Sequence, residues 1–205
     1  MKIIFLDIDG VLNFESHYRS KGFTNYRNAK RQLKKDVKSE KIERLDYYRS
    51  QINIQALKRI ERLCKRTKAS IVISSTWRLG ITIEEFHEIF DYCGLTEKLP
   101  IIGTTPHFHV DIYGSLPRGC EIKHWLEKKG FKHINWSTEE QQKYIDSSGI
   151  ENYIIIDDDS DMLYNQRNHF VHIHPFPRNS NGFSQAYYKI AVDKLSKTVI
   201  ELNFQ

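Results

Sequence analysis

The chain has 205 residues, of which 40% are hydrophobic, and a formal net charge of +5 at pH 7. A chain of this length can bury one sizeable core, so we expect a single domain over residues 1–205. The apolar runs are far shorter than the roughly 20 residues that cross a bilayer, the N-terminus lacks the features of a signal peptide, and the scattered cysteines form no CxxC pair, so we expect a cytoplasmic protein with no membrane partner, disulfide framework or thiolate zinc site.

Short apolar runs alternate with helical patterns along the chain. Residues 2–6, KIIFL, are typical of a buried parallel strand. Asn53 can cap a helix whose apolar residues recur at helical spacing from Ile54 to Cys64. The other expected elements are helices from about Thr82 to Gly94, at 121–129 and at 184–195, and strands at 70–73, 99–103, 152–156 and 170–173. This alternation predicts an α/β fold, a Rossmann-like three-layer α/β/α domain with a parallel sheet.

Residues 14–50 interrupt this alternation. The segment is polar and aromatic, and it holds eleven Lys or Arg against five Asp or Glu, whereas the rest of the chain is nearly neutral. We interpret it as a small, mostly helical insertion. Its cations can contact phosphates and its flat rings can stack on unpaired bases, which favours a single-stranded nucleic-acid end as partner. The alternative is a solvated basic helix whose aromatic residues pack on the core. The cations assigned to nucleic-acid binding are Lys30, Arg31, Lys34 and Lys35.

Polar residues follow the ends of three expected strands. They are Asp7 and Asp9, then Ser74 and Ser75, then the acidic run 157–161. Parallel order brings these ends to one edge of the sheet, where ligands bind in such folds. Gathered carboxylates repel one another unless a cation lies among them, and hard oxygen ligands suit Mg²⁺. With hydroxyl and N–H groups beside them, they form the minimum equipment for phosphoryl transfer.

These motifs resemble those of the haloacid dehalogenase (HAD) superfamily. Apolar strands ending in DxDG, in Ser and in paired acids stand at residues 5–10, 71–75 and 154–158. The remaining motif of the superfamily is a Lys or Arg near the start of a helix, for which Arg118 and Lys123 are candidates. We favour Arg118 because it immediately precedes the expected helix, whereas Lys123 lies a turn inside it.

The resemblance implies the catalytic roles. Asp7 would attack phosphorus and form an aspartyl-phosphate, while Asp9 would protonate the leaving alcohol and then activate water. Ser74 and Arg118 would hold the transferring phosphoryl group, with Ser75 beside them. The segment at 14–50 stands where HAD enzymes place a cap over the active site, so it would help to choose the substrate.

The resemblance also implies a Mg²⁺ site. Its ligands would be Asp7, the backbone carbonyl of Asp9, and Asp157 or Asp158, with Asp161 helping directly or through a water.

Arg78, just past the serine motif, has two open interpretations: it binds a second substrate phosphate, or it pins a neighbouring acid.

More narrowly, several stretches resemble the HAD domains of bacterial and phage RNA-repair proteins, which are relatives of polynucleotide 3′-phosphatases. They include SSTWR at 74–78, RGCEI at 118–122 and DDDSD at 157–161. The chain has no GxxxxGK[ST] loop, so kinase or ligase steps would need separate partner proteins. The implied function is a Mg²⁺-dependent phosphomonoester hydrolase, favoured as a nucleic-acid 3′-end phosphatase. The alternatives are a small-metabolite or nucleotide phosphatase, a phosphotransferase, and a catalytically inactive nucleic-acid-binding module.

Overall fold

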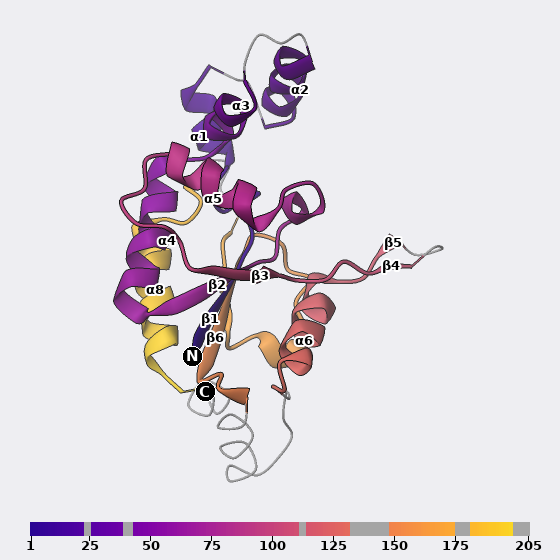
Figure 1. The fold of residues 1–205 in the computed structure, drawn as a ribbon, viewed down its shortest axis with the longest axis vertical. Coiled ribbons are helices and arrows are strands. Elements are labelled where there is room, and N and C mark those ends of the chain that lie inside the picture. Colours follow the sequence, from indigo (N-terminus) through magenta and orange to yellow (C-terminus); the bar gives the residue numbers. More distant parts are fainter. Residues whose placement is uncertain (23–25, 39–42, 111–113, 132–147, 175–180, 199–205) are drawn as a thin grey trace.

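The structure is a computed structural model that describes residues 1–22, 26–38, 43–110, 114–131, 148–174 and 181–198. Within this part of the chain, five parallel strands form one sheet in the order β3-β2-β1-β6-β7 (Figure 1). The strands are β1 (Lys2–Leu6), β2 (Ala69–Ile73), β3 (Ile101–Thr104), β6 (Asn152–Asp157) and β7 (Phe170–His172). A parallel sheet flanked by helices confirms the predicted α/β fold class.

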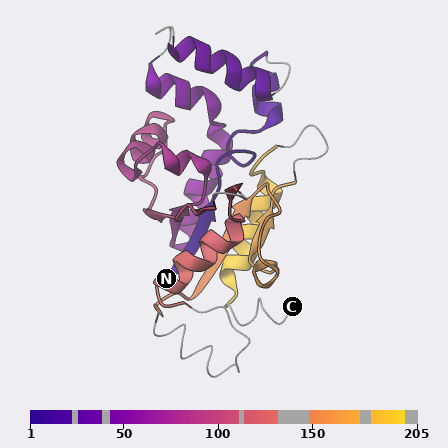
Figure 2. The same cartoon turned by 90° about the vertical axis from the view of Figure 1, so that its right-hand side faces the viewer.

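Helices cover both faces of the sheet because successive residues of a strand point to opposite sides. In β1, Ile4 and Leu6 belong to the core cluster formed with α4 (Ile54–Thr67) and α8 (Gln185–Ser196). Ile3 and Phe5 belong to the cluster formed with α6 (Arg118–Lys128). Figures 1 and 2 show α4 and α8 on one side of the sheet and α6 on the other. The strand therefore reads as a continuous apolar run, since both of its faces are buried.

Side-chain caps set the starts of two helices between β1 and β3. The side chain of Asn53 accepts a hydrogen bond from the backbone N of Ala56 at the start of α4. Thr82 and Glu85 form a capping box at the start of α5 (Ile83–Tyr92). The short 3₁₀ turn η1 (Thr76–Leu79) follows β2, and η2 (Tyr164–Gln166) precedes β7.

No helix in the described part of the chain is long and apolar enough to cross a membrane.

The predicted insertion is helical. It contains α1 (Glu15–Ser20), α2 (Tyr26–Lys38) and α3 (Arg44–Gln51), and we call it the α1–α3 segment. Figures 1 and 2 show the segment beyond the carboxyl ends of the strands. Its buried apolar cluster is small, formed by Tyr18, Ala29 and Leu33 with Tyr47 against them. The segment meets the main body where α3 packs on α5.

Two stretches differ from the sequence expectation. Helix α6 begins at Arg118, about one turn before the expected start, because Pro117 at the N-cap position ends the preceding extended stretch. The expected loop at 104–116 contains β4 (His109–Val110) and β5 (Gly114–Ser115), which pair antiparallel. The pairing of β4 and β5 has no strong local signal, since strands of two residues show no periodicity.

Candidate active site

The carboxyl ends of β1, β2 and β6 bring polar residues together. The last residue of β1 pairs with both neighbouring strands, so Asp7, Ser74 and Asp157 reach the same edge. Carboxylate oxygens of Asp7, Asp157 and Asp158 lie within 4.8 Å of one another. The side chains of Asp7 and Asp157 are buried, and Asp158 is partly exposed. The three acids form one cluster, in which Asp158 is the most exposed member.

Gly10, the glycine of the DxDG motif, makes room for this cluster. Its φ of +74° lies in the left-handed region that favours glycine. A Cβ at this position would collide with the carboxylate of Asp158. The loop after β1 can therefore run close to the acidic pair only with glycine at position 10.

Burial makes the cluster electrostatically costly. It raises the pKa of Asp7 and of Asp157 well above the usual range of an aspartate, because a charged carboxylate loses its hydration there. Neighbouring carboxylates raise these pKa values further, and the Arg118 guanidinium lowers them in part. Burial also raises the pKa of Asp158 to about 6. Further positive charge is therefore needed to keep all of these acids ionised together.

Arg118 supplies one positive charge at the cluster. Its Nη1 lies 3.3 Å from Asp7 Oδ1 and 4.0 Å from Asp157 Oδ2, and its side chain is 15% exposed. The backbone N–H of Arg118 donates to Asp161 Oδ2 at 2.7 Å, so Asp161 anchors the start of α6. The other candidate cation, Lys123, is 40% exposed and pairs with Glu127 on the same helix. The structure thus brings Arg118, and not Lys123, to Asp7.

Asp9 is held by donors from three parts of the chain. Its Oδ1 accepts hydrogen bonds from Asn13 Nδ2 at 2.7 Å and from Trp77 Nε1 at 3.3 Å. Lys30 of α2 reaches down from the α1–α3 segment, with Nζ 3.1 Å from Oδ1 and 3.3 Å from Oδ2. Nothing in the local sequence marks Asn13 and Trp77 as partners of Asp9, and neither was predicted as a site residue.

The two serines after β2 have different surroundings. The Ser75 hydroxyl accepts a hydrogen bond from the backbone N of Trp77 at 3.4 Å, and its interaction with Asp7 lowers the pKa of that acid in part. The Ser74 hydroxyl is buried and has no hydrogen-bond partner among the described residues, and the same is true of Asp157 Oδ2. Buried polar atoms without partners are uncommon in folded proteins. Their unused capacity is consistent with a site that takes up a ligand.

Arg78 is enclosed in a buried network of hydrogen bonds. Its Nη2 lies 2.6 Å from Glu121 Oε2, and both side chains are only 3% exposed. Its other donors reach backbone carbonyls, including that of Ser75. This placement matches the interpretation in which Arg78 pins an acid, since a guanidinium enclosed in this way has little surface for a substrate phosphate.

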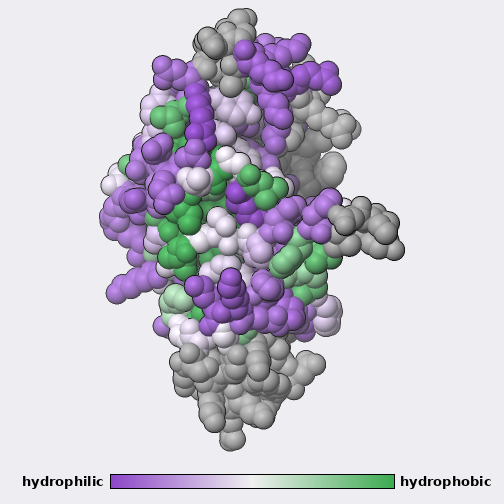
Figure 3. All heavy atoms as spheres, turned by 45° about the vertical axis from the view of Figure 1, so that its right-hand side comes forward, coloured by the Kyte–Doolittle hydropathy of each residue, from purple (hydrophilic) through white to green (hydrophobic). Residues whose placement is uncertain are grey.

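The remaining basic residues of the predicted set lie on α2. Arg31, Lys34 and Lys35 are exposed, whereas Lys30 is half-buried against Asp9. Figure 3 shows mostly hydrophilic side chains where the α1–α3 segment lies. The structure therefore separates one lysine that reaches the site from three cations that face solvent.

The cluster has the donors that a Mg²⁺ ion requires. Its side-chain ligands would be carboxylate oxygens of Asp7, Asp157 and Asp158, with no soft nitrogen or sulfur donor among them. Asp157 Oδ2, which accepts no hydrogen bond from the described residues, is a buried acceptor that a cation would satisfy. Within the described residues, Asp9 and Asp161 do not contribute side chains to this group. The residues present therefore fit the metal that the motifs imply.

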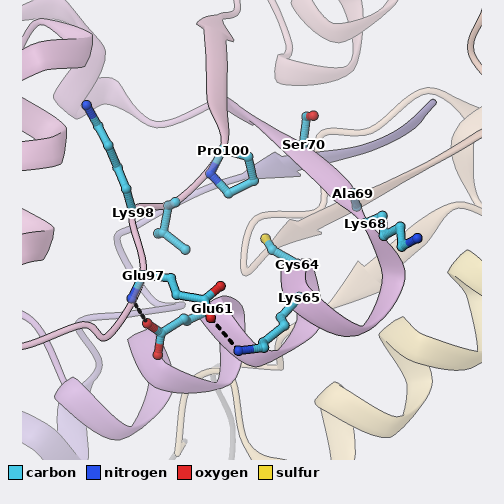
Figure 4. A pocket seen from close by; sticks show the side chains of 10 residues that line it. Glu61, Cys64, Lys65, Lys68, Ala69, Ser70, Glu97, Lys98 and Pro100 are labelled. Atoms are coloured by element: carbon cyan, nitrogen blue, oxygen red, sulfur yellow. Dashed lines mark hydrogen bonds and ion pairs between the residues drawn. The ribbon is translucent and has the colours of Figure 1, made fainter.

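A pocket at the opposite end of β2 shows a different arrangement. It has a volume of about 270 Å³ and lies between the end of α4 and the loop before β3. In Figure 4, Lys65 pairs with Glu97, whose backbone N–H donates to Glu61. These acids already have partners, so this pocket lacks the uncompensated carboxylates of the other sheet edge.

The sequence profile of one family matches the chain over residues 3–138, which is more than half of its length. The matched range includes Asp7, Ser74 and Arg118, and the fold then adds β6 with Asp157 at the same edge. Comparison with curated proteins and with solved structures gives no match. The matching family is described as the HAD domain in Swiss Army Knife RNA repair proteins, and the chain belongs to it, as the motifs predicted.

Proposed function

We propose that this domain is a Mg²⁺-dependent phosphomonoesterase that works through an aspartyl-phosphate on Asp7. The observation that carries the proposal is the sheet edge itself, where Arg118 lies 3.3 Å from Asp7 beside Asp157 and Asp158. Phosphoryl transfer depends mainly on positioning and charge neutralisation, and this edge provides both. Mg²⁺ bound by the three acids would neutralise charge on the phosphoryl oxygens.

In the first proposed step, a carboxylate oxygen of Asp7 bonds to phosphorus while the bond from phosphorus to the leaving oxygen breaks. Asp9 gives its proton to that oxygen, so the product leaves as a neutral alcohol. Asn13 and Trp77 both donate to Asp9 Oδ1. Lys30 Nζ lies 3.1 Å from Oδ1 and 3.3 Å from Oδ2 of the same carboxylate, so these contacts hold Asp9 in place for the proton exchange.

In the second proposed step, the Asp9 carboxylate takes a proton from water. The resulting oxygen bonds to phosphorus, the bond from phosphorus to Asp7 breaks, and inorganic phosphate leaves. Arg118 faces the attacked group throughout, because its guanidinium lies against the nucleophile. Asp7 ends as the free carboxylate, and Asp9 ends protonated, ready for the next turnover.

For the substrate, we propose a 3′-phosphate on a single-stranded RNA or DNA end. Support comes from the family, whose description names RNA repair proteins. The exposed cations Arg31, Lys34 and Lys35 on α2 lie in the α1–α3 segment beyond the sheet edge, where they can contact backbone phosphates. In this proposal the segment is a cap, and any kinase or ligase step is carried out by separate proteins.

Phosphate release from a substrate panel tests this function. The panel contains a 3′-phosphorylated oligonucleotide, a nucleoside monophosphate, a sugar phosphate and a small aryl phosphate, each with Mg²⁺. We expect the oligonucleotide to have the highest kcat/KM and Asp7→Asn to release no phosphate. A preference for the free nucleotide or sugar phosphate would indicate a small-metabolite phosphatase. Oligonucleotide binding without any hydrolysis would indicate an inactive binding module.

A further inference from the structure

The Arg78–Glu121 ion pair lies outside the proposed chemistry, yet it is one of the most enclosed charged pairs in the described part of the chain. Both side chains are 3% exposed, with Arg78 Nη2 2.6 Å from Glu121 Oε2. Removing two charges from water is costly, and an apolar pair of similar volume would often stabilise the fold as well or better. Stability alone is therefore a weak reason for its presence.

The hydrogen bonds of Arg78 join loops that follow neighbouring strands. Nη1 donates to the carbonyl of Ser75 at 2.6 Å, in the loop after β2. Nε donates to the carbonyl of Thr105 at 2.9 Å and Nη2 to that of Pro106 at 2.9 Å, both in the loop after β3. A planar guanidinium fixes the directions as well as the distances of its partners. Arg78 thus locks these two loops in one relative position.

Glu121 extends the lock to α6. It lies in the first turn of that helix, and its other oxygen accepts from the backbone N of Phe108 at 3.2 Å and contacts His107 Nδ1 at 3.2 Å. Arg118 begins the same turn and places Nη1 on Asp7. The ion pair therefore connects the helix that carries the cation to the loop that carries Ser75.

The opposite side of this turn is also held. Asp161 accepts from the backbone N of Arg118 at 2.7 Å, and Gln166 Nε2 donates to the carbonyl of Gly119 at 3.0 Å. A Cβ at Gly119 would collide with the backbone N of Leu163. The first turn of α6 is therefore fixed on one side by the residues after β6 and on the other by the ion pair.

We propose that Arg78 and Glu121 are positioning residues: their buried ion pair is a brace that aligns Arg118 and Ser75 on Asp7. The inference rests on the proposed function, because it assigns the brace to the phosphoryl-transfer site. In the described part of the chain, the hydrogen bonds and ion pairs of both residues go to groups outside the acidic cluster, so we assign them a role through Arg118 and Ser75. A misplacement of about 1 Å at a reacting centre can cost on the order of 100-fold in rate.

The test compares two equal substitutions on α6. Glu121→Gln keeps the shape but sets an amide against the Arg78 guanidinium, whereas Glu127→Gln removes a carboxylate that is 42% exposed. For the oligonucleotide 3′-phosphate, we expect Glu121→Gln to lower kcat about 10- to 100-fold. We expect Glu127→Gln to change kcat by less than about twofold.

A double-mutant cycle with Arg118→Ala separates positioning from general damage. If the brace acts through Arg118, Glu121→Gln should add little loss once Arg118 is absent, so the two effects are strongly non-additive. Should Glu121→Gln fail to fold, the Arg78→Met/Glu121→Met double variant replaces the pair by apolar side chains. That variant is expected to fold and to remain slow. Full additivity in the cycle, or a fast double variant, would overturn the proposal.

A readout without turnover separates this inference from the proposed function. The Nε–Hε signal of Arg118 is assigned in a ¹H–¹⁵N spectrum by its loss in Arg118→Ala. Glu121→Gln, or the double variant where the single one does not fold, should shift or broaden this signal, while Glu127→Gln should leave it in place. If the wild-type protein hydrolyses no phosphomonoester, the proposed function fails and this signal alone decides whether the brace exists. If the Arg118 signal stays unchanged when the Arg78–Glu121 ion pair is broken, the brace is ruled out.

Discussion

The sheet edge and the α1–α3 segment hold their charged groups in opposite ways. At the edge, Asp7 and Asp157 are buried, and Arg118 reaches them from a helix whose first turn is bonded on two sides. On α2, Arg31 and Lys34 are exposed, and the apolar cluster beneath them is small. A group that must meet a reacting atom needs a fixed position, whereas a cation that meets a nucleic-acid backbone needs only proximity. In the proposed function, the sheet edge carries out the chemistry and the α1–α3 segment chooses the substrate.

Lys30 connects the two regions. It belongs to α2, yet its ammonium lies 3.1 Å from Asp9 at the sheet edge. Its neighbour on α2, Arg31, is exposed instead. The two cations are adjacent in the sequence, yet Lys30 contacts Asp9 at the sheet edge and Arg31 faces solvent. Substitution of Lys30 should therefore affect the sheet edge, whereas substitution of Arg31 should affect only the segment.

The largest effect should come from the edge. Asp7→Asn keeps the size of the side chain but removes the nucleophile, so we expect kcat to fall by about 10⁴-fold or more, on the scale of nucleophile loss in other enzymes. Steady-state phosphate release measures this, with circular dichroism to verify the fold. Near-normal turnover by the variant would exclude Asp7 as the nucleophile.

Asp9→Asn should have the next largest effect. Removing a general acid typically costs about 10²- to 10⁴-fold. We expect the loss to be greatest for alkyl esters, whose leaving groups most need the proton, and smallest for an aryl phosphate with an acidic phenol. The rate of alcohol or phenol release in a single turnover, for a series of leaving groups, provides the measurement, because it reports the first step and not the slow hydrolysis of the intermediate. An equal loss across the series would assign a structural role to Asp9.

Mg²⁺ should stabilise the fold through the same cluster. At a Mg²⁺ concentration of about 100 times its Kd, binding contributes about 2.7 kcal/mol, which corresponds to a rise in Tm of about 5–10 °C for a domain of this size. Differential scanning fluorimetry with Mg²⁺ and with a chelator measures the shift. Asp157→Asn should lose most of it, while its metal-free form loses no stability, because one of the repelling buried acids is gone. If neither Mg²⁺ nor the chelator changes the Tm of the wild-type protein, the result would argue against the metal site.

The smallest effect should come from α2. Replacing Arg31, Lys34 and Lys35 together by Gln should raise KM for the oligonucleotide roughly 10-fold and weaken its salt dependence, since the lost contacts are exposed and ionic. Hydrolysis of a small aryl phosphate should stay within about twofold. The matched control replaces exposed cations on the helices of the main body: Lys58, Arg66 and Lys189. If both triple variants raise KM equally, net charge and not the segment explains the effect.

Much of this organisation was accessible from the sequence because it follows from local patterns. The apolar run before Asp7 and the spacing after Asn53 predicted β1 and α4, and parallel order predicted that Asp157 would meet Asp7. The choice of Arg118 over Lys123 rested on its place at the start of a helix, and the structure puts it beside Asp7. These inferences need only the period of an element and the direction of a strand.

Other features depend on contacts between residues that are distant in sequence. Trp77 reaches Asp9 across 68 positions, and Arg78 reaches Glu121 across 43. No spacing rule connects such pairs, because the packing of segments that are far apart in the sequence decides them. The hairpin of β4 and β5 was missed for another reason, since its strands are too short to show alternation. Hydrogen bonds and ion pairs between side chains that are distant in sequence are therefore the part of the site that local sequence patterns do not predict.

The central claim is that Asp7 becomes phosphorylated during turnover. Asp9→Asn mixed with Mg²⁺ and an aryl phosphate should still form the acyl phosphate, because the phenol leaves without a proton, but it should hydrolyse the intermediate slowly. After an acid quench, peptide mass spectrometry should find an alkali-labile phosphoryl group on Asp7, and the Asp7→Asn/Asp9→Asn variant should show none. Rapid phosphate release with no labelled peptide at any time, or a label on another residue, would contradict the account.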